Sequence, residues 1–408
     1  MSTETPKKHV IILGAGASAT SGYPLANRLR LLMSSEQVLK AELAKFNGPG
    51  LDQVFATVFD ERTKQAVELF RHGGFATIDE FSYLARGKFA KEVQSLKRLL
   101  RFALALQDPE DKFQDSDYYL FIQKLFHKEL FPLRNDYAIL TFNYDPYLPY
   151  LLSKAYRTRC KALGKQCEEN AVNAITSAFS WRLVGPLEQG NELCVLQLHG
   201  CIAWPTGSDE HPRIWYYDLF GNTLEERVKR LCASSAARTV PPIIFPWEIF
   251  TERGEIINER EFCLKHDCDP EAAQGGYGGI RLHQIFESIW KRARREINAA
   301  TTISFVGLSM HEFLTPAFKY LFQERKNDAQ LVCANWEHRN FSGGSAQQRV
   351  VEVGMNPLSP TFKLRRLLKE ICPFLKGANS YGTMTWPDQG PTVRIREDFK
   401  DFIANEME

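Results

Sequence analysis

The sequence predicts an α/β protein with a Rossmann-like parallel sheet that carries helices on both faces, plus a helical insertion module. Three observations predict this fold. Short apolar segments recur along the chain, segments with helical spacing separate them, and small or polar residues directly follow the apolar segments. Near-continuous apolar strands are typical of a parallel sheet that is buried on both faces.

Each predicted strand is a short run of apolar residues. The run at residues 9–13, HVIIL, is partly β-branched and ends at a glycine, as expected for a buried strand that stops at a turn. Later runs have the same character. The predicted strands are residues 9–13, 137–141, 194–198, 243–245, 302–306 and 330–334.

The chain between the first two predicted strands is too long for an ordinary βαβ crossover. Its apolar residues repeat with helical spacing, so we expect a helical insertion over residues 37–131. The predicted helices of this insertion are residues 41–46, 55–70, 78–90, 93–106 and 118–130. The expected Rossmann-like core comprises residues 1–36 and 132–340, and residues 341–408 form a C-terminal extension.

Composition and charge narrow the class of protein. Of the 408 residues, 44% are hydrophobic and 25% are charged, which excludes a wholly disordered chain. The net charge of only +2 argues against a protein that coats nucleic acid or an anionic membrane. No apolar stretch approaches the roughly 18 residues that span a bilayer, and the N-terminal apolar run is too short for a signal peptide. We therefore expect a cytoplasmic protein.

Three further features admit a plain and a functional interpretation. Four possible metal ligands stand at Cys263, His266, Cys268 and His283. Their spacing matches no common site, so a polar loop is favoured and no metal is expected. The glycine-rich residues 275–279 form either a lid over a site or a surface connection. The basic run 291–295 fits a solvated helix face better than a nucleic-acid contact, so direct nucleic-acid binding is not expected.

A glycine-rich turn follows the first predicted strand. Residues 14–19, GAGASA, fit the pattern G-x-G-x-x-G/A of nucleotide-binding turns. Gly14 suits the tight turn, and Gly16 removes a side chain where a pyrophosphate would approach the backbone. Such turns also arise from close strand–helix packing alone. The acidic residue expected about 20 residues later is Glu36, which stands in helix-like sequence, so an ordinary dehydrogenase domain is disfavoured.

The second predicted strand runs into the segment TFNYD, residues 141–145. Ligands of open α/β sheets bind beyond the carboxyl ends of strands, and an asparagine there can orient a water or a ribose hydroxyl. Asn143 is therefore a candidate site residue. The alternative is that Asn143 or Asp145 caps the helix that begins near Pro146.

Three more predicted strands end in small or polar residues. His199 and a glycine follow the third strand, and histidine is the side chain best suited to proton transfer near neutral pH. A lone histidine at a strand end is otherwise structural. Gly307 and Ser309 follow one later strand, and Asn335 follows the last. Coincidence explains the whole set poorly, because all these residues should meet at one edge of the sheet.

These motifs, in this order, resemble the sirtuin-like superfamily: GAGAS, T-x-N-x-D, HG, G-x-S and a strand that ends in asparagine. The variant TFNYD is more similar to the sirtuin-like NAD hydrolases of bacterial anti-phage defence. Residues 22–24, GYP, and 78–81, IDEF, are similar to segments of that branch. The four-cysteine zinc ribbon of the deacetylases is missing, and nothing after the HG pair matches their peptide-binding segment, which puts protein deacetylation in doubt.

The resemblance implies a role for each matching residue. His199 matches the catalytic histidine, and Asn143 is the second residue that we expect to be catalytic. Asp145 is implied to lie, with Asn143, near the nicotinamide ribose and carboxamide, and Thr141 is a further NAD-binding residue. The remaining NAD-binding residues that the resemblance implies are Gly14, Ala15, Gly16 and Ser18 at the phosphates, and Gly307, Ser309 and Asn335 along the phosphate and adenosine half.

The resemblance further implies that the protein hydrolyses NAD to nicotinamide and ADP-ribose, and so depletes NAD in anti-phage defence. NAD is the substrate, and no metal is expected. The enzymatic alternatives are an NAD-dependent deacylase and an ADP-ribosyl transferase; the non-enzymatic alternative is a sensor or assembly module that binds NAD or ADP-ribose. Members of this branch self-associate and work beside a HerA-type ATPase or a short Argonaute, so a homo-oligomer and such a partner are expected.

Overall fold

The structure is a computed structural model. It describes residues 8–19, 22–45, 51–86, 88–107, 116–126, 136–145, 147–162, 164, 194–202, 240–266, 282–335, 359–372, 375, 393–396 and 399–407. The predicted glycine loop at 275–279 and the possible ligand Cys268 lie outside these residues.

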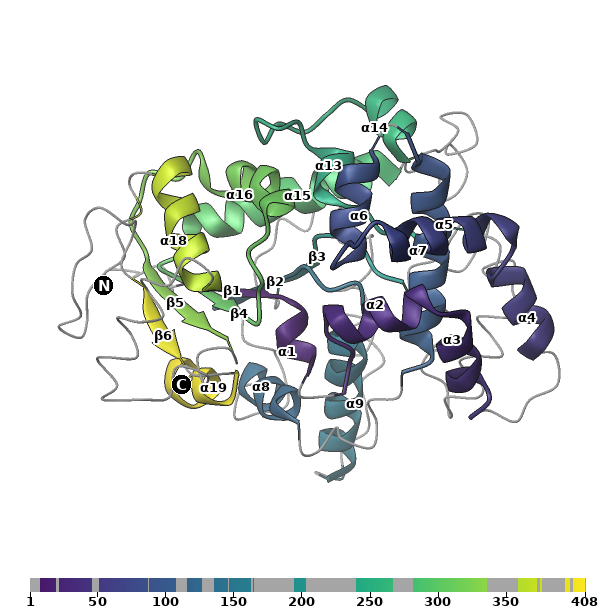
Figure 1. Cartoon of the computed structure of the whole chain (residues 1–408). Coiled ribbons are helices and arrows are strands. Elements are labelled where there is room, and N and C mark those ends of the chain that lie inside the picture. Colours follow the sequence, from purple (N-terminus) through teal and green to yellow (C-terminus); the bar gives the residue numbers. More distant parts are fainter. Residues whose placement is uncertain are drawn as a thin grey trace, which may run out of the picture.

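A six-stranded parallel sheet forms the centre of the fold (Figure 1). Its strands are β1 (His9–Leu13), β2 (Tyr137–Thr141), β3 (Cys194–Gln197), β4 (Thr302–Val306), β5 (Gln330–Ala334) and β6 (Arg394–Arg396). The order across the sheet is β3-β2-β1-β4-β5-β6, and every neighbouring pair is parallel. This is the doubly wound Rossmann order, which reverses direction between β1 and β4. The predicted α/β fold class is confirmed.

The register places the ends of the central strands at one level. Leu13, the last residue of β1, pairs with Thr141 of β2 on one side and with Val306 of β4 on the other. Residues 10–13 and the whole of β2 are buried, because helices cover both faces of the sheet. The segments that follow these strands therefore emerge side by side at the same edge.

Helices cover both faces of the sheet (Figure 1). One face carries α15 (Leu282–Ala299), α16 (Thr315–Phe322) and α18 (Pro360–Ile371). The other face carries α8 (Asp117–Leu125), α9 (Tyr147–Ala162) and α19 (Phe399–Glu406). Of these, α15 contacts β3, and α19 contacts β5 and β6.

Apart from α8, the helices described between β1 and β2 form a group beside the sheet (Figure 1). These are α1 (Ala15–Ala19), α2 (Ala26–Ser34), α3 (Glu36–Leu43), α4 (Leu51–Val58), α5 (Glu61–His72), α6 (Ile78–Ala85) and α7 (Ala90–Ala105). The long helix α7 is the centre of this group, because α2, α4, α5 and α6 all contact it. The shorter elements after β3 are α13 (Pro246–Ile249), α14 (Glu259–His266) and the 3₁₀ helix η5 (Glu312–Leu314).

Two predicted elements are wrong. Residues 243–245 form no strand of the sheet: Ile243 makes one isolated antiparallel bridge with Gly200, and α13 begins directly afterwards. Prolines on both sides explain this, because proline donates no ladder hydrogen bond and favours the first turn of a helix. The single helix predicted at 55–70 is two helices, α4 and α5, because the Asp60 carboxylate caps α5 by accepting from the Thr63 amide at 2.8 Å.

The tail contributes a strand that the sequence did not predict. β6 pairs with β5, and its flanking arginines, Arg394 and Arg396, form ion pairs with Glu406 of α19. Its three residues contain no apolar run, so its place in the sheet depends on these partners. Among the described residues, none of the helices combines the length and the apolar character that crossing a membrane requires.

Candidate functional site

A cavity of about 540 Å³ lies at the carboxyl ends of the central strands. Its walls include the segments that follow β1, β2, β3, β4 and β5, residues of α2 from the predicted core, and residues of α6 from the predicted insertion. The strand order reverses between β1 and β4, and the crevice outside the strand ends at such a point is where open α/β sheets bind ligands. Every predicted site residue except Thr141 lines this cavity: Gly14, Ala15, Gly16, Ser18, Asn143, Asp145, His199, Gly307, Ser309 and Asn335.

The glycines of the first turn pack against the turn after β4. A Cβ atom on Gly16 would lie 2.8 Å from the Cα of Gly307, and one on Gly14 would lie 2.6 Å from its carbonyl oxygen. The amides of Gly14 and Gly16 donate to the carbonyls of Val306 and Gly307, at 2.9 and 2.8 Å. These glycines are therefore required by close packing, and two of the amides expected at a phosphate already have backbone acceptors.

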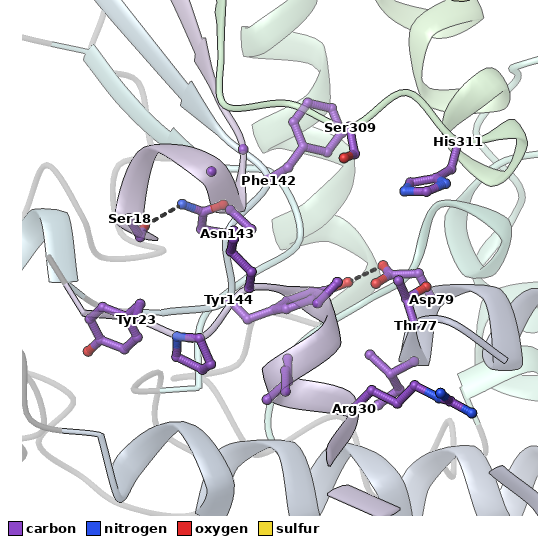
Figure 2. Close-up of a pocket in the computed structure, with 18 of the residues that line it drawn as sticks. Ser18, Tyr23, Arg30, Thr77, Asp79, Phe142, Asn143, Tyr144, Ser309 and His311 are labelled. Carbon is purple, nitrogen blue, oxygen red and sulfur yellow. Dashed lines mark hydrogen bonds between the residues drawn. The ribbon is translucent and has the colours of Figure 1, made fainter. Parts of the chain in front are cut away.

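Ser18 joins the two polar residues of the TFNYD segment (Figure 2). Its hydroxyl accepts a hydrogen bond from Nδ2 of Asn143 at 2.8 Å and donates to Oδ2 of Asp145 at 3.3 Å. The other carboxylate oxygen of Asp145 accepts from the Tyr147 amide at 3.0 Å, so Asp145 also caps α9, as the alternative interpretation proposed. Burial raises the pKa of Asp145 to about 6.

Thr141 lies at the end of β2 and away from the cavity wall. It is buried, and its hydroxyl oxygen accepts a hydrogen bond from the backbone amide of Asn143 at 3.1 Å. Thr141 therefore fixes the backbone that carries Asn143, although the sequence analysis placed it among the NAD-binding residues.

Successive residues of the TFNYD segment alternate between two contacts, one with Ser18 and one with His199. Asn143 and Asp145 bond to Ser18, whereas the rings of Phe142 and Tyr144 pack on His199. The Phe142 ring meets the imidazole edge-on at 5.0 Å between centroids, and the Tyr144 ring stacks on it at 5.4 Å and 24°. Asn143 and His199 thus line the same cavity, and the TFNYD segment contacts His199 through its aromatic residues.

His199 is a buried histidine whose imidazole lacks a polar partner. Its side chain lines the cavity and is 2% exposed, and within the described part of the chain neither Nδ1 nor Nε2 has a hydrogen-bond partner. Burial lowers the pKa of His199 to about 3, with the Lys97 charge adding to the decrease and the Glu248 charge opposing it. The imidazole is therefore neutral at physiological pH and can accept a proton.

Three further residues add polar groups at the cavity, and the sequence motifs assign no role to them. Arg30 of α2 lines the cavity, and its buried Nε has no hydrogen-bond partner among the described residues. Of the described residues that line the cavity, Arg30 alone is an arginine or lysine. On α6, Asp79 accepts a short hydrogen bond from the Tyr144 hydroxyl (Figure 2). His311 also lines the cavity, close to α6 in this view (Figure 2).

The sequence signals for these residues were weak. Asp79 and Tyr144 stand within the IDEF and TFNYD segments, which indicated the family resemblance without a role for either side chain. Arg30 stands in no motif. It reaches the cavity because α2 packs beside the strand ends, and no local pattern in the sequence predicts such a contact.

The possible metal ligands have other partners. The His266 Nδ1 lies 3.4 Å from a carboxylate oxygen of Glu248, and the His283 Nε2 lies 2.7 Å from the Ile257 carbonyl oxygen. Within the described ranges, no group of three histidine, cysteine or acidic residues could hold a metal ion. In the basic run at 291–295, two side chains form ion pairs with glutamates of the same helix, α15.

No protein-family model matches the chain, and no curated protein is significantly similar to it. The sirtuin-like motifs therefore remain a resemblance, carried by the residues around this cavity.

Proposed function

We propose that this protein hydrolyses NAD to nicotinamide and ADP-ribose, and that this reaction depletes NAD in anti-phage defence. The observation that carries the proposal is the imidazole of His199, which lines the cavity with both ring nitrogens unpartnered among the described residues. A buried polar atom without a partner costs about 1–3 kcal/mol of stability. Such atoms call for a functional explanation, and here a ligand would supply the missing partner.

The proposed reaction breaks the bond between C1′ of the ribose and the ring nitrogen of nicotinamide. This nitrogen is positively charged in NAD, so the bonding electron pair leaves with neutral nicotinamide and no strong acid is needed. C1′ gains oxocarbenium character, as in glycoside cleavage, and a water oxygen forms the new bond. As it bonds to C1′, this water becomes strongly acidic, so even the weakly basic His199 imidazole, whose pKa is lowered to about 3, accepts its proton and later returns it to solvent.

Asn143 would orient the ribose hydroxyls or the attacking water. Its amide is fixed by Ser18 and by the Thr141 contact to its backbone. A carboxamide offers both donors and an acceptor, which suits hydroxyl groups and water. Because the amide is held before a ligand binds, little side-chain entropy would be lost on binding.

The pyrophosphate of NAD needs positive charge, and Arg30 is the candidate source. A guanidinium stays protonated at all physiological pH values and binds phosphate oxygens with two parallel hydrogen bonds. Because two amides of the glycine turn already have backbone acceptors, Arg30 is favoured over these amides as the donor to the phosphates. A cavity of about 540 Å³ is within the usual range for cofactor-sized ligands.

The test is to mix the purified protein with NAD and to separate the products by chromatography. The proposal predicts equal amounts of nicotinamide and ADP-ribose without any acceptor, and loss of both in His199→Ala and Asn143→Ala variants that keep wild-type melting curves. Nicotinamide release only with an acyl-lysine or another acceptor would favour a deacylase or a transferase. Saturable NAD binding without products would favour a sensor.

Self-association and a HerA-type ATPase or short Argonaute partner belong to the same proposal. Uncontrolled NAD hydrolysis would harm the cell, so a partner or assembly would be expected to control the reaction. The assay is therefore run with the chain alone and with such a partner added. Sedimentation under both conditions shows whether activity follows assembly.

A further inference from the structure

A hydrogen bond connects the cavity wall to helix α6. The Tyr144 hydroxyl, beyond the end of β2, donates to Oδ1 of Asp79 in the first turn of α6 (Figure 2). Both side chains line the cavity. Figure 2 shows the Tyr144 side chain extending from beside Asn143 toward Asp79. The insertion thus contacts the TFNYD segment at the tyrosine that packs on His199.

Helix α6 is a fixed support for this contact. At its start, the hydroxyl of the N-cap residue Thr77 accepts from the Glu80 amide at 3.0 Å, and the Glu80 carboxylate accepts from the amide of Ala76, the residue before the cap, at 2.6 Å. One turn further on, the Ser82 hydroxyl accepts from Nε1 of Trp247 at 2.6 Å. Asp79 and Ser82 are three residues apart and so share one helix face, which is bonded to the core at both positions.

His199 needs an external support because no polar partner holds it. Functional histidines are commonly oriented by a hydrogen bond from one ring nitrogen to a carboxylate or carbonyl. Here neither ring nitrogen has such a partner among the described residues. Instead, ring packing orients the imidazole: the Phe142 ring meets it edge-on, and the Tyr144 ring stacks on its face. The Tyr144 ring is in turn fixed at its far end by Asp79.

We propose that Asp79 is a positioning residue: by holding the Tyr144 hydroxyl, it keeps the Tyr144 ring against His199 and so fixes the imidazole at the cavity. Its effect on reaction rate rests on the proposed hydrolysis of NAD, but its effect on the imidazole does not. Without Asp79, the Tyr144 ring can turn about its side-chain bonds, and the imidazole loses its face-on contact. A small misplacement of a reacting group can lower a rate by about a hundredfold.

Four variants test the proposal. Asp79→Ala and Tyr144→Phe each remove one end of the hydrogen bond, and the double variant removes both. Asp79→Asn keeps an acceptor oxygen for the tyrosine. We expect Asp79→Ala and Tyr144→Phe each to lower kcat about ten- to a hundredfold, with KM nearly unchanged. The kcat of the double variant should be no lower than that of the less active single variant, because both changes remove the same hydrogen bond. Asp79→Asn should recover much of the lost rate.

Ser82→Ala is the matched control. It removes another hydrogen bond between α6 and the core, on the same face of the helix, but neither Ser82 nor Trp247 lines the cavity. It is expected to lower the melting temperature and to leave kcat within about twofold of wild type. Equal losses of kcat in Ser82→Ala and Asp79→Ala would overturn the proposal, because they would indicate a general loosening of α6.

A second readout needs no reaction. NMR spectra of protein with labelled histidine, assigned with a His199→Leu variant, report the ring-current shift that Tyr144 imposes on the imidazole. The His199 signals are expected to move in Asp79→Ala and to stay in place in Ser82→Ala.

Unmoved signals in Asp79→Ala would refute the positioning role even if the wild type hydrolyses NAD. A wild type that releases no nicotinamide would refute the hydrolysis while this readout still decides the role of Asp79. A higher KM with unchanged kcat would instead place Asp79 at the substrate.

Discussion

The imidazole of His199 stacks on the phenol ring of Tyr144, with centroids 5.4 Å apart and planes 24° apart. The two residues follow β3 and β2, which are neighbours in the sheet. A ring face offers no hydrogen bond to the imidazole nitrogens. The contact therefore orients His199 and leaves its two ring nitrogens available to a ligand in the cavity. One set of residues positions the imidazole, and its nitrogens remain for the reaction.

Replacing His199 by leucine should stabilise the protein and abolish NAD hydrolysis. The buried nitrogens of His199 have no partner within the described residues, and two aromatic rings pack on the imidazole, so leucine removes a desolvation cost. We expect a gain of about 1–2 kcal/mol in the free energy of unfolding, measured by urea denaturation at pH 7. A variant that is less stable than wild type would mean that the imidazole makes a favourable contact in the folded protein.

Wild type and the His199→Leu variant should differ increasingly in their free energy of unfolding as the pH falls. The pKa of His199 is lowered from 6.5 to about 3 in the folded state, so below pH 6.5 only the unfolded chain takes up this proton. Wild type therefore loses stability relative to His199→Leu between pH 6.5 and 3, by about 1.4 kcal/mol per pH unit. Urea denaturation of both proteins at pH 7, 6 and 5 measures this slope.

The comparison with the variant is necessary because two carboxyl groups act in the opposite direction. Burial raises the pKa of Asp79 and of Asp145 to about 6, so the folded state binds their protons first as the pH falls, which adds stability. These contributions occur in both proteins and cancel in the difference. A difference that stays constant from pH 7 to 5 would show that His199 titrates normally in the folded state.

The sequence predicted the sheet where each strand carries its own apolar run. The predicted bounds of β1, β2, β4 and β5 match those of the structure. Because parallel strands end at a common edge, the polar residues after them could be expected to meet, and Asn143 and His199 do line one cavity. β6 was missed because it holds a single apolar residue, Ile395, between two arginines, and because its partner in the sheet, β5, is distant in sequence.

The part of the site contributed by helices α2 and α6 could not be predicted from local patterns. Arg30 and Asp79 reach the cavity because α2 and α6 pack beside the strand ends, and periodicity gives the buried face of a helix but not what that face meets. The glycine turn shows a related limit. Its pattern predicted a phosphate contact, whereas Gly16 and Gly307 lack side chains because their backbones touch.

Gly307→Ala should unfold or severely destabilise the protein. A Cβ atom at this position would lie 2.1 Å from the Ala17 amide nitrogen, and its φ of +61° is unfavourable for alanine. Gly74→Ala is the control, because Gly74 has φ of +71° but no atom within 4 Å of the added Cβ. We expect a loss of about 1 kcal/mol in Gly74→Ala and at least about 3 kcal/mol in Gly307→Ala, measured by urea denaturation. Equal losses would mean that backbone strain alone, and not the contact between the two turns, requires glycine at 307.

Arg30→Gln should weaken the binding of ADP-ribose, measured by isothermal titration calorimetry. Glutamine keeps much of the length and polarity of the side chain but removes its charge, and charged hydrogen bonds to a ligand contribute about 1.5–3 kcal/mol, or about ten- to a hundredfold in Kd. Nicotinamide riboside, which has one ribose and no phosphate, tests the source of the loss. Its binding should be unchanged in the variant, because in the proposed binding mode the missing charge would face only the phosphates.

Arg28→Gln serves as the control for charge, since Arg28 is on the same helix, is exposed, pairs with Glu42 at 2.7 Å and does not line the cavity. It should bind ADP-ribose as wild type does. Raising the salt concentration should weaken ADP-ribose binding more in wild type than in Arg30→Gln, because the screened interaction is already lost in the variant. Equal affinity of wild type and Arg30→Gln would place the pyrophosphate elsewhere, and the other amides of the glycine turn would be the next donors to test.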